Sequence, residues 1–177
     1  MHQQPSVIWL AAFGAAISIP AGATTYFSVA EVSEQLFPAQ LLTPVPMVLT
    51  PADVKAVQKA SGVRVRESRL KLWRAADGGW MYIDRVLGKH EYITYALALD
   101  ANGAVTGLEI LEYRETYGDQ VRHPKWRAQF TGKQHGATLK LQADIANLSG
   151  ATLSSLHLTE GVRRLLATHQ LVVAARG

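Results

Sequence analysis

Alternating hydrophobic and polar positions in the central part of the chain predict four β-strands. From Val63 onward the hydrophobic period is two, and β-branched and aromatic residues are frequent. Turn-forming stretches separate these segments, and both residues of Asn102-Gly103 tolerate the positive φ of a tight hairpin turn. Because short turns join successive strands, the pattern indicates an antiparallel meander. The predicted strands are residues 64–73, 80–87, 92–99 and 105–113.

A hydrophobic period close to that of a helix predicts two helices before this meander. Ser28 opens one helical pattern that Pro38 ends, and Thr50 is suited to cap a second. Pro51 at the first helical position and Asp53 in the first turn support the second helix. The proline-rich stretch between the two helices is predicted to be a connector.

The part of the chain after the meander predicts a long irregular region followed by one helix. Residues 114–148 lose the alternation, and irregular stretches of this length inside a domain tend to be functional. The helix is expected from about Leu153 to Thr168, with a single apolar face and with Arg163-Arg164 on its solvated side. Residues 171–174 are compatible with a last strand. The apolar face comprises Leu158, Val162, Leu165, Leu166 and His169.

Together these elements predict an α+β fold, in which helices pack on an antiparallel β-sheet meander. The length of 177 residues fits one domain of this kind. We expect residues 63–177 to form that domain and residues 24–62 to form an N-terminal helical appendage, with Gly62 at the boundary.

The segment 1–23 is predicted to be a signal peptide. Its apolar run, residues 7–23, ends in Ala21-Gly22-Ala23, which matches the small-residue pattern of a cleavage site. The run of 17 residues is short for a membrane span, which needs about 20. No lysine or arginine precedes it, so an uncleaved anchor and a buried helix remain as alternatives. The sequence therefore predicts export to the periplasm, with anchoring to the inner membrane as the second option.

The composition excludes several kinds of site. The chain has no cysteine, which excludes disulfides, Cys-rich zinc sites, iron–sulfur clusters and the C-x-x-C-H haem attachment. Its histidines show no recognisable metal-binding spacing, and the G-x-S-x-G motif of serine hydrolases is absent. We therefore expect no metal site and no catalytic triad.

The net charge of +4 includes a basic stretch between residues 121 and 140 that contains no carboxylate. Such a stretch is usually a solvated surface, and nucleic-acid binding is the conventional alternative. Since export argues against a nucleic-acid partner, an anionic cofactor or an acidic protein is the better expectation. The basic residues are Arg122, Lys125, Arg127, Lys133 and Lys140.

A cluster of small and hydroxylated residues, SGATLSS at 149–155, opens the last predicted helix. A helix N-terminus carries unsatisfied N–H groups and a partial positive charge, and Gly150 and Ala151 let an anion approach the backbone. The alternative is ordinary capping, in which one of the hydroxyls accepts from the first turn, and spacing alone favours it. The candidate capping residues are Ser149, Thr152, Ser154 and Ser155.

The cluster 149–155, followed by HLTEGVRRLL, resembles the signature of the FMN-binding domain found in flavoprotein subunits of the Rnf and sodium-pumping quinone reductase complexes. Small exported flavoproteins share that domain. The resemblance implies that Thr152 carries FMN through a phosphoester, attached by an FAD:protein FMN transferase. A second block, residues 113–130, is similar to the family's E-T-x-G loop at Glu115, Thr116 and Gly118. The resemblance covers roughly residues 63–170.

The resemblance also implies roles for the residues around Thr152. Ser149, Gly150, Ala151, Ser154 and Ser155 would surround the phosphate, and Glu115, Thr116 and Gly118 would line the isoalloxazine ring. Tyr113, Trp126 and Phe130 either stack on the ring or belong to the core, and aromatic residues at this spacing are more often core. His123, next to Arg122, is a further candidate for the phosphate or the flavin edge.

One position departs from the family pattern. Members usually place an aspartate three residues before the first residue of the S/T-G-A-T motif, where this chain has Ala146. Asp144 lies two residues upstream of that position and Asn147 one residue downstream. Noncovalent binding of FMN therefore remains an alternative.

The expected function is that of an exported electron-transfer flavoprotein rather than a stand-alone enzyme. It would pass electrons to or from a membrane-bound haem or quinone-linked redox protein, and the protein's part would be to bind, orient and tune FMN. Two alternatives stay open: a flavin-dependent reductase acting on a small periplasmic substrate, and a flavin-free binding module whose SGAT cluster is only a helix cap.

Overall fold

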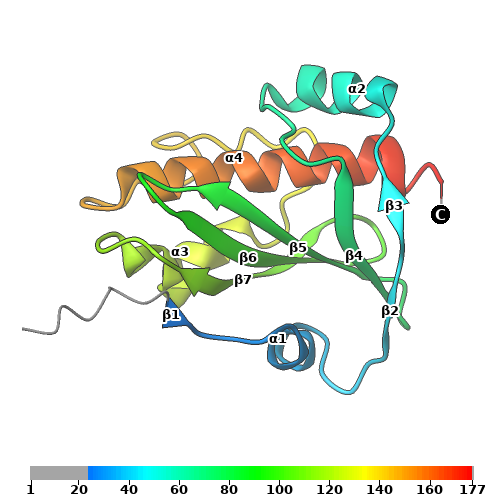
Figure 1. Cartoon of the computed structure of the whole chain (residues 1–177), viewed down its shortest axis with the longest axis horizontal. Coiled ribbons are helices and arrows are strands. Elements are labelled where there is room, and N and C mark those ends of the chain that lie inside the picture. Colours follow the sequence, from blue (N-terminus) through cyan, green and yellow to red (C-terminus); the bar gives the residue numbers. More distant parts are fainter. Residues whose placement is uncertain (1–23, 177) are drawn as a thin grey trace, which may run out of the picture.

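The computed structural model of the chain describes residues 24–176 and is built around one antiparallel sheet (Figure 1). The sheet order is β1-β7-β6-β5-β4-β2, and β3 pairs with β4 off this path. The predicted α+β fold and the meander of β4 to β7 are thus confirmed. The strands are β1 (Thr24–Thr25), β2 (Leu42–Pro44), β3 (Met47–Val48), β4 (Arg69–Ala75), β5 (Trp80–Leu87), β6 (Tyr92–Leu99) and β7 (Val105–Tyr113).

The predicted signal peptide, residues 1–23, lies outside the described residues. Within residues 24–176, none of the helices has the length and apolar character that crossing a membrane requires.

The first two helices begin at the capping residues that the sequence predicts. In α1 (Val29–Leu36), the Ser28 hydroxyl accepts from the backbone N–H of Glu31, whose carboxylate accepts from the Ser28 N–H in return. In α2 (Pro51–Ser61), Thr50 and Asp53 form the same reciprocal pair. Such a capping box satisfies two N–H groups that would otherwise lack partners.

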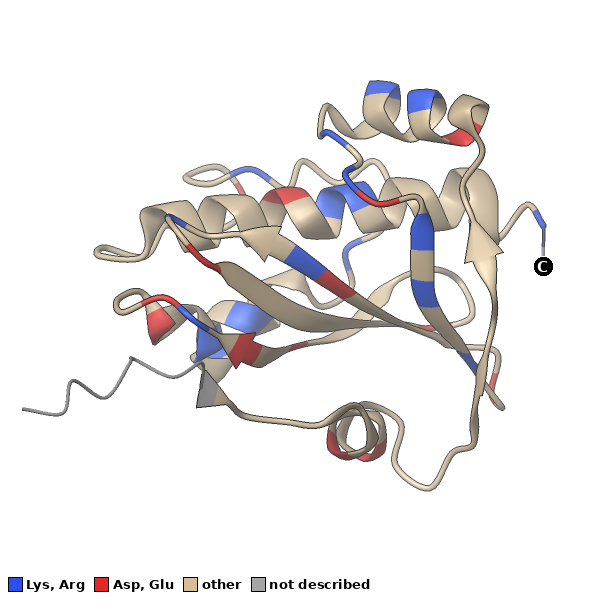
Figure 2. Cartoon of the chain, viewed as in Figure 1, with Lys and Arg blue, Asp and Glu red and all other residues tan. Residues whose placement is uncertain are grey.

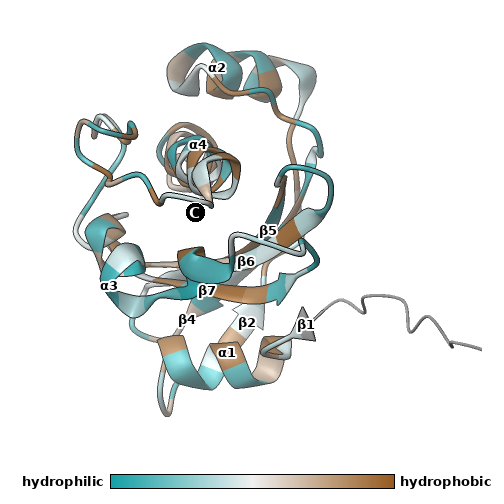
Figure 3. Cartoon of the chain, turned by 90° about the vertical axis from the view of Figure 1, so that its left-hand side faces the viewer, coloured by the Kyte–Doolittle hydropathy of each residue, from teal (hydrophilic) through white to brown (hydrophobic). Residues whose placement is uncertain are grey.

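The helices form layers on both faces of the sheet. The long helix α4 (Thr152–Thr168) packs on one face, with α2 on its outer side, and α1 crosses the opposite face (Figure 3). A glycine allows the close packing of α4, because a Cβ at Gly161 would lie 2.5 Å from the hydroxyl of Tyr95 on β6. The core between α4 and the sheet includes Tyr82, Tyr95, Leu97, Leu108, Leu158 and Val162.

Residues 24–62 contribute to the same sheet and the same packing layers. β1 pairs with β7, β2 and β3 pair with β4, and α1 covers a second apolar cluster under the sheet. Val57 of α2 packs with Ala167 and Val172 in a third.

Three local predictions are wrong. The connector between α1 and α2 contains β2 and β3, which are edge strands; an edge strand tolerates proline because one of its sides needs no N–H donor. β4 begins at Arg69, five residues later than predicted. Residues 171–174 add no strand, because α4 continues into a π-helical turn, η3 (His169–Val173), in which the N–H of Ala174 donates to the carbonyl of His169.

The turn between β6 and β7 also differs from the expected tight hairpin. Only Gly103 of the Asn102-Gly103 pair has a positive φ, at 77°. The carboxylate of Asp100 accepts from the N–H groups of Asn102 and Ala104 at 2.8 and 2.9 Å and so holds a longer loop. A single αL glycine is sufficient in a loop of this length.

Candidate functional site

The two sequence blocks singled out above meet at the N-terminal end of α4. Gly118 lies against Ala151 and Ser154, since a Cβ placed on it would be 3.4 Å from the Ala151 Cα and 3.3 Å from the Ser154 Oγ. Its φ is 96°, a conformation that favours glycine. The E-T-x-G loop and the SGATLSS cluster therefore form one site, although more than 30 residues separate them in the sequence.

Tyr113, at the end of β7, ties the two blocks together. Its hydroxyl donates to the carbonyl of Tyr117 at 2.6 Å and lies 3.0 Å from the Ser154 Oγ. The side chain is 3% exposed, and burial raises the pKa of its hydroxyl, so the proton needed for these bonds is retained. This arrangement places Tyr113 in the core beneath the site rather than on a surface where it would stack on a flavin.

The hydroxyls of the cluster do not cap α4. The N-cap position is held by Ala151, and among the described residues no side chain accepts from the first turn. Ser155 instead donates to the Ala151 carbonyl at 2.9 Å, and Ser154 is bound to Tyr113. The capping alternative is therefore wrong, and the N-terminal N–H groups of a 17-residue helix are left without a side-chain partner.

Thr152 occupies the first turn of this uncapped end, and its side chain is exposed. Ser149 and Gly150 before it are also exposed, and Ala151 packs into the core. Gly150 has a φ of 82° with no atom within 4 Å of the position of a Cβ, so the turn requires glycine for its backbone conformation and leaves open space beside it. The Thr152 hydroxyl is thus presented to solvent with little bulk around it.

Asn147 is a site residue that the sequence reasoning mentioned only as a neighbour of Ala146. Its amide nitrogen donates to the Thr152 hydroxyl at 3.3 Å. Its amide oxygen lies 3.2 Å from the Ser155 hydroxyl and is an alternative to the Ala151 carbonyl as acceptor of that hydroxyl's one proton. Nothing in the sequence distinguishes Asn147 from any other polar loop residue, because the contact depends on the turn at Gly150.

The carboxylate of Asp144 is engaged elsewhere. It accepts from the Lys133 ammonium at 2.8 Å and from the backbone N–H groups of Leu139 and Lys140. Partial burial opposes ionisation, but these contacts outweigh it and lower the pKa of Asp144. Asp144 therefore stabilises the loop 139–145 and does not substitute for the aspartate that Ala146 replaces.

Glu115 binds the turn between β5 and β6. Its carboxylate accepts from the N–H groups of His90 and Glu91 at 2.6 and 3.0 Å. Burial opposes ionisation here too, and the backbone donors still lower the pKa of Glu115. Glu115 thus fixes the β5–β6 turn next to the site, and Thr116 and Tyr117 are exposed, the latter by 83%.

Trp126 and Phe130 belong to the core, as the alternative to flavin stacking predicts. Both are buried, and their rings pack edge to face with centroids 5.2 Å apart. The Trp126 indole donates to the carbonyl of Ala146 at 2.8 Å, which supports the loop in front of α4. These residues lie in the irregular region, where α3 (Pro124–Arg127) stands between the 3₁₀ turns η1 (Asp119–Arg122) and η2 (Ala128–Phe130).

A pocket of about 240 Å³ lies along α4 beside the β5–β6 turn. Leu87 and Tyr92, which flank that turn, line it together with His157 and Gly161 of α4. The Nδ1 atom of His157 is buried and has no hydrogen-bond partner among the described residues. The pocket therefore offers space beside His157, within one turn of the cluster 149–155 on α4.

Much of the basic charge is used inside the protein. Figure 2 shows lysine and arginine residues over α3, where Arg127 pairs with the buried carboxylate of Glu109. Arg122 lies over the Tyr26 ring at 3.3 Å from its centroid, and His123 caps α3 by accepting from the Lys125 N–H. His123 and Arg122 are thus occupied within the fold.

The prediction of a solvated Arg163-Arg164 pair is wrong. Arg164 forms a largely buried ion pair with Asp84 of β5, and Arg163 donates to the carbonyls of Ser61 and Leu139 at 2.8 and 3.0 Å. Both arginine side chains bind groups outside α4, and helical periodicity alone does not predict such contacts.

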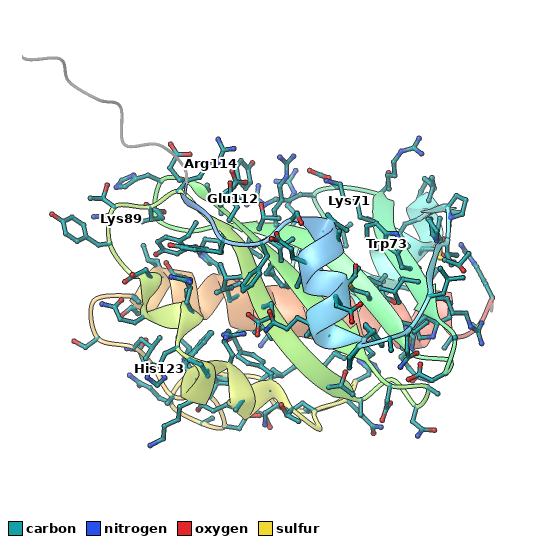
Figure 4. The ribbon with its side chains drawn as sticks, turned by 90° about the horizontal axis from the view of Figure 1, so that it is seen from below. Lys71, Trp73, Lys89, Glu112, Arg114 and His123 are labelled. Carbon is teal, nitrogen blue, oxygen red and sulfur yellow. The ribbon has the colours of Figure 1, made fainter. Side chains whose placement is uncertain are left out.

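Exposed charges remain at the same end of the molecule as the site. Figure 4 shows Lys89, Glu112 and Arg114 together at that end, on the far side of α1 from Lys71 and Trp73. Arg114 pairs with Glu112 at 2.7 Å, and Lys89 is exposed in the β5–β6 turn.

In the part of the chain that the structure describes, no cluster of three or more histidine or acidic side chains could hold a metal ion. The chemistry that the site can offer is therefore an exposed hydroxyl beside a free helix N-terminus.

The chain is similar to a known family of flavin-binding domains. A search of the curated proteins gives no match to the chain. The family model of the FMN-binding domain matches residues 88–167, a range that begins at the β5–β6 turn and contains both blocks. Residues 88–167 therefore belong to the FMN-binding domain family, and this match indicates FMN as the cofactor.

Proposed function

We propose that the protein is an exported electron-transfer flavoprotein in which FMN is held as a phosphoester on Thr152. The observation that carries the proposal is the exposed Thr152 hydroxyl at a helix N-terminus that no side chain caps among the described residues. A threonine in that position is accessible to a transferase, and capping does not engage its oxygen.

The charge of the ester suits this position. Esterification converts the phosphate monoester of FMN, with a second ionisation near pH 6, into a diester with one negative charge. The free N–H groups and the partial positive charge of the α4 N-terminus can offset that charge. FMN supplies the electron-transfer chemistry, and the chain supplies attachment, orientation and surroundings.

A covalent link also suits an exported protein. The occupancy of a reversible site falls with the concentration of free ligand, which is expected to be low outside the cytoplasm. An ester on Thr152 removes that dependence. Export itself rests on the apolar run at residues 7–23 and is tested by isolating the periplasmic fraction and determining the N-terminus of the mature chain.

Two kinds of partner follow from this proposal. An FAD:protein FMN transferase would attach the cofactor, and a membrane-bound haem or quinone-linked redox protein would exchange electrons with it. Both must reach the cofactor, and the exposed residues Thr116, Tyr117, Thr152 and Leu153 leave this end of α4 accessible.

The covalent link is tested by co-expression with a flavin transferase, followed by denaturation and detection of flavin fluorescence that migrates with the polypeptide. We expect fluorescence in the parent and none in Thr152→Val. Thr131→Val is the matched control, because it removes an exposed threonine hydroxyl outside the cluster 149–155 and outside the block 113–130, and it should leave the label intact. A parent that binds FMN only until denaturation would show a noncovalent site, and a Thr152→Val variant that still carries the label would place the ester elsewhere.

The second candidate function, a flavin-dependent reductase, is favoured by the pocket next to His157. A reductase would turn over a small substrate with a soluble electron donor, whereas a carrier would be reduced once and stop. Steady-state turnover of the purified flavoprotein with an artificial donor separates the two.

A further inference from the structure

The family usually has an aspartate three residues before its attachment motif, and this chain has Ala146 there. A different side chain, that of Asn147, contacts the acceptor Thr152. Ala146 has only a methyl group, and its backbone is bound to Gln129 and Trp126. Asp144 is held by Lys133 and two backbone N–H groups. Within residues 24–176, Asn147 is the side chain that hydrogen-bonds the Thr152 hydroxyl.

The contact is built by the loop in front of α4. The Ala151 N–H donates to the Leu148 carbonyl at 3.0 Å, and Gly150 adopts a φ of 82°. This turn folds the chain back, so that Asn147 lies over the first turn of the helix. Its two amide atoms then contact Thr152 and Ser155, three residues apart on that turn.

From this geometry we propose that Asn147 is the positioning residue for attachment of the flavin, an inference that rests on the proposed ester at Thr152. Ser155 is fully buried, and its hydroxyl lies 3.2 Å from the Asn147 amide oxygen and 2.9 Å from the Ala151 carbonyl. When its single proton is directed at the Asn147 oxygen, it fixes the amide of Asn147. The fixed amide then directs its N–H at the Thr152 oxygen. Threonine has few side-chain rotamers, and one hydrogen bond is sufficient to select among them.

The attachment step shows what such a donor contributes. The Thr152 Oγ attacks the phosphorus of the FMN half of FAD, and an Oγ–P bond forms. The bond between that phosphorus and the oxygen bridging to AMP breaks, and AMP leaves with the oxygen and its electron pair. The hydroxyl proton passes to a base of the transferase. As the proton leaves, negative charge grows on the Thr152 oxygen, and a directed N–H donor stabilises it.

The test measures the rate at which purified flavin-free protein gains FMN from FAD and transferase, followed as the mass increase of the intact chain. Loss of one hydrogen bond in the transition state predicts a rate about tenfold lower in Asn147→Ala. Asn102→Ala is the matched control, because that residue lies in the β6–β7 turn at the other end of the sheet and should react like the parent. Thermal unfolding of each variant reports whether the fold is kept.

Asn147→Asp separates positioning from a structural role. The ionised aspartate is isosteric with asparagine, but it cannot donate a hydrogen bond. A carboxylate near a helix N-terminus does not destabilise the helix. We therefore expect Asn147→Asp to react as slowly as Asn147→Ala while its melting temperature stays at or above that of the parent.

The outcomes distinguish the two proposals. Parent protein that gains no mass overturns the ester on Thr152 and this inference with it. If the parent and Asn147→Ala react at equal rates, only the role of Asn147 is overturned, and the ester on Thr152 stands. An Asn147→Asp variant that reacts at the parental rate or faster would also overturn it, because a carboxylate would then serve in place of a donor.

Discussion

The two ends of α4 differ in the exposure of the residue that matters most at each and in how the helix is continued there. At the N-terminal end, Thr152 is exposed, the helix is uncapped, and Gly150 gives the preceding turn an αL conformation. At the C-terminal end, the helix continues into η3, and His169 is 4% exposed, hydrogen-bonded to the hydroxyl of Tyr82 at 2.8 Å. Burial of this kind stabilises the fold, whereas exposed polar groups contribute little to it. The comparison therefore predicts that substitutions at the two ends separate folding from flavin attachment.

The largest effect on stability is expected from His169→Ala. The change removes a buried ring that packs on Trp80 and leaves the hydroxyl of Tyr82, itself 1% exposed, without its partner. Cavity formation and the unpaired hydroxyl together should lower the free energy of unfolding by about 3 kcal/mol. Chemical denaturation of the two variants measures the contrast, since Thr152→Val should change stability by no more than about 0.5 kcal/mol.

Attachment should show the reverse pattern. Folded His169→Ala protein, assayed in conditions where it remains native, should gain FMN at the parental rate because its substitution lies at the opposite end of the helix. A loss of labelling in His169→Ala that exceeds its unfolded fraction would show that the two ends of α4 are coupled.

The next largest effect is expected from Gly118→Ala, at the contact between the two blocks. A Cβ there would lie 2.6 Å from the Tyr113 hydroxyl, which is held by Tyr117 and Ser154 and cannot move without breaking those bonds. This clash and the strain of a positive φ should together lower the free energy of unfolding by about 2 to 3 kcal/mol. Gly132→Ala is the matched control, because Gly132 has a φ of 78° and no atom near its Cβ position.

The control substitution should cost about 1 kcal/mol, the strain alone. The difference between the two variants, measured by denaturant unfolding, isolates the contact between the E-T-x-G loop and α4. Equal losses in both variants would mean that the loop is free to move away from Ser154.

The parts of this architecture that local patterns determine were predictable. The strands β5 to β7 follow from alternation, and Ser28 and Thr50 mark their helices because a capping box lies within four residues. The core face of α4 follows from its period. Local chemistry also pointed to Thr152, but only the family resemblance gave it a role.

The parts that depend on distant residues were not predictable. The ion pair of Arg164 with Asp84 joins residues 80 positions apart, and Glu115 reaches back 25 positions to His90. Both charges resemble solvated surface residues in the sequence. The edge strands β2 and β3 were not predicted for the same reason, because their pairing with β4 overrides the proline-rich composition. The role of Asn147 likewise exists only once the Gly150 turn is formed.

The smallest effect is expected from pH, again at the buried end of α4. Burial lowers the pKa of His169 below its ordinary value of 6.5, and the nearby charge of Asp100 only partly opposes this. The unfolded chain therefore binds the proton more readily than the folded one, so stability should fall as the pH is lowered from about 6.5 toward the depressed folded value. Denaturant unfolding between pH 5 and 8 measures the slope of the free energy of unfolding against pH. This interval avoids the range in which Glu115 and Asp144 titrate. His169→Gln has no titrating group at this position and should lose that part of the slope, whereas an unchanged slope would assign it to another histidine. The exposed N-terminal end should contribute nothing to it, because Thr152 and its neighbours in the cluster 149–155 do not titrate in this range.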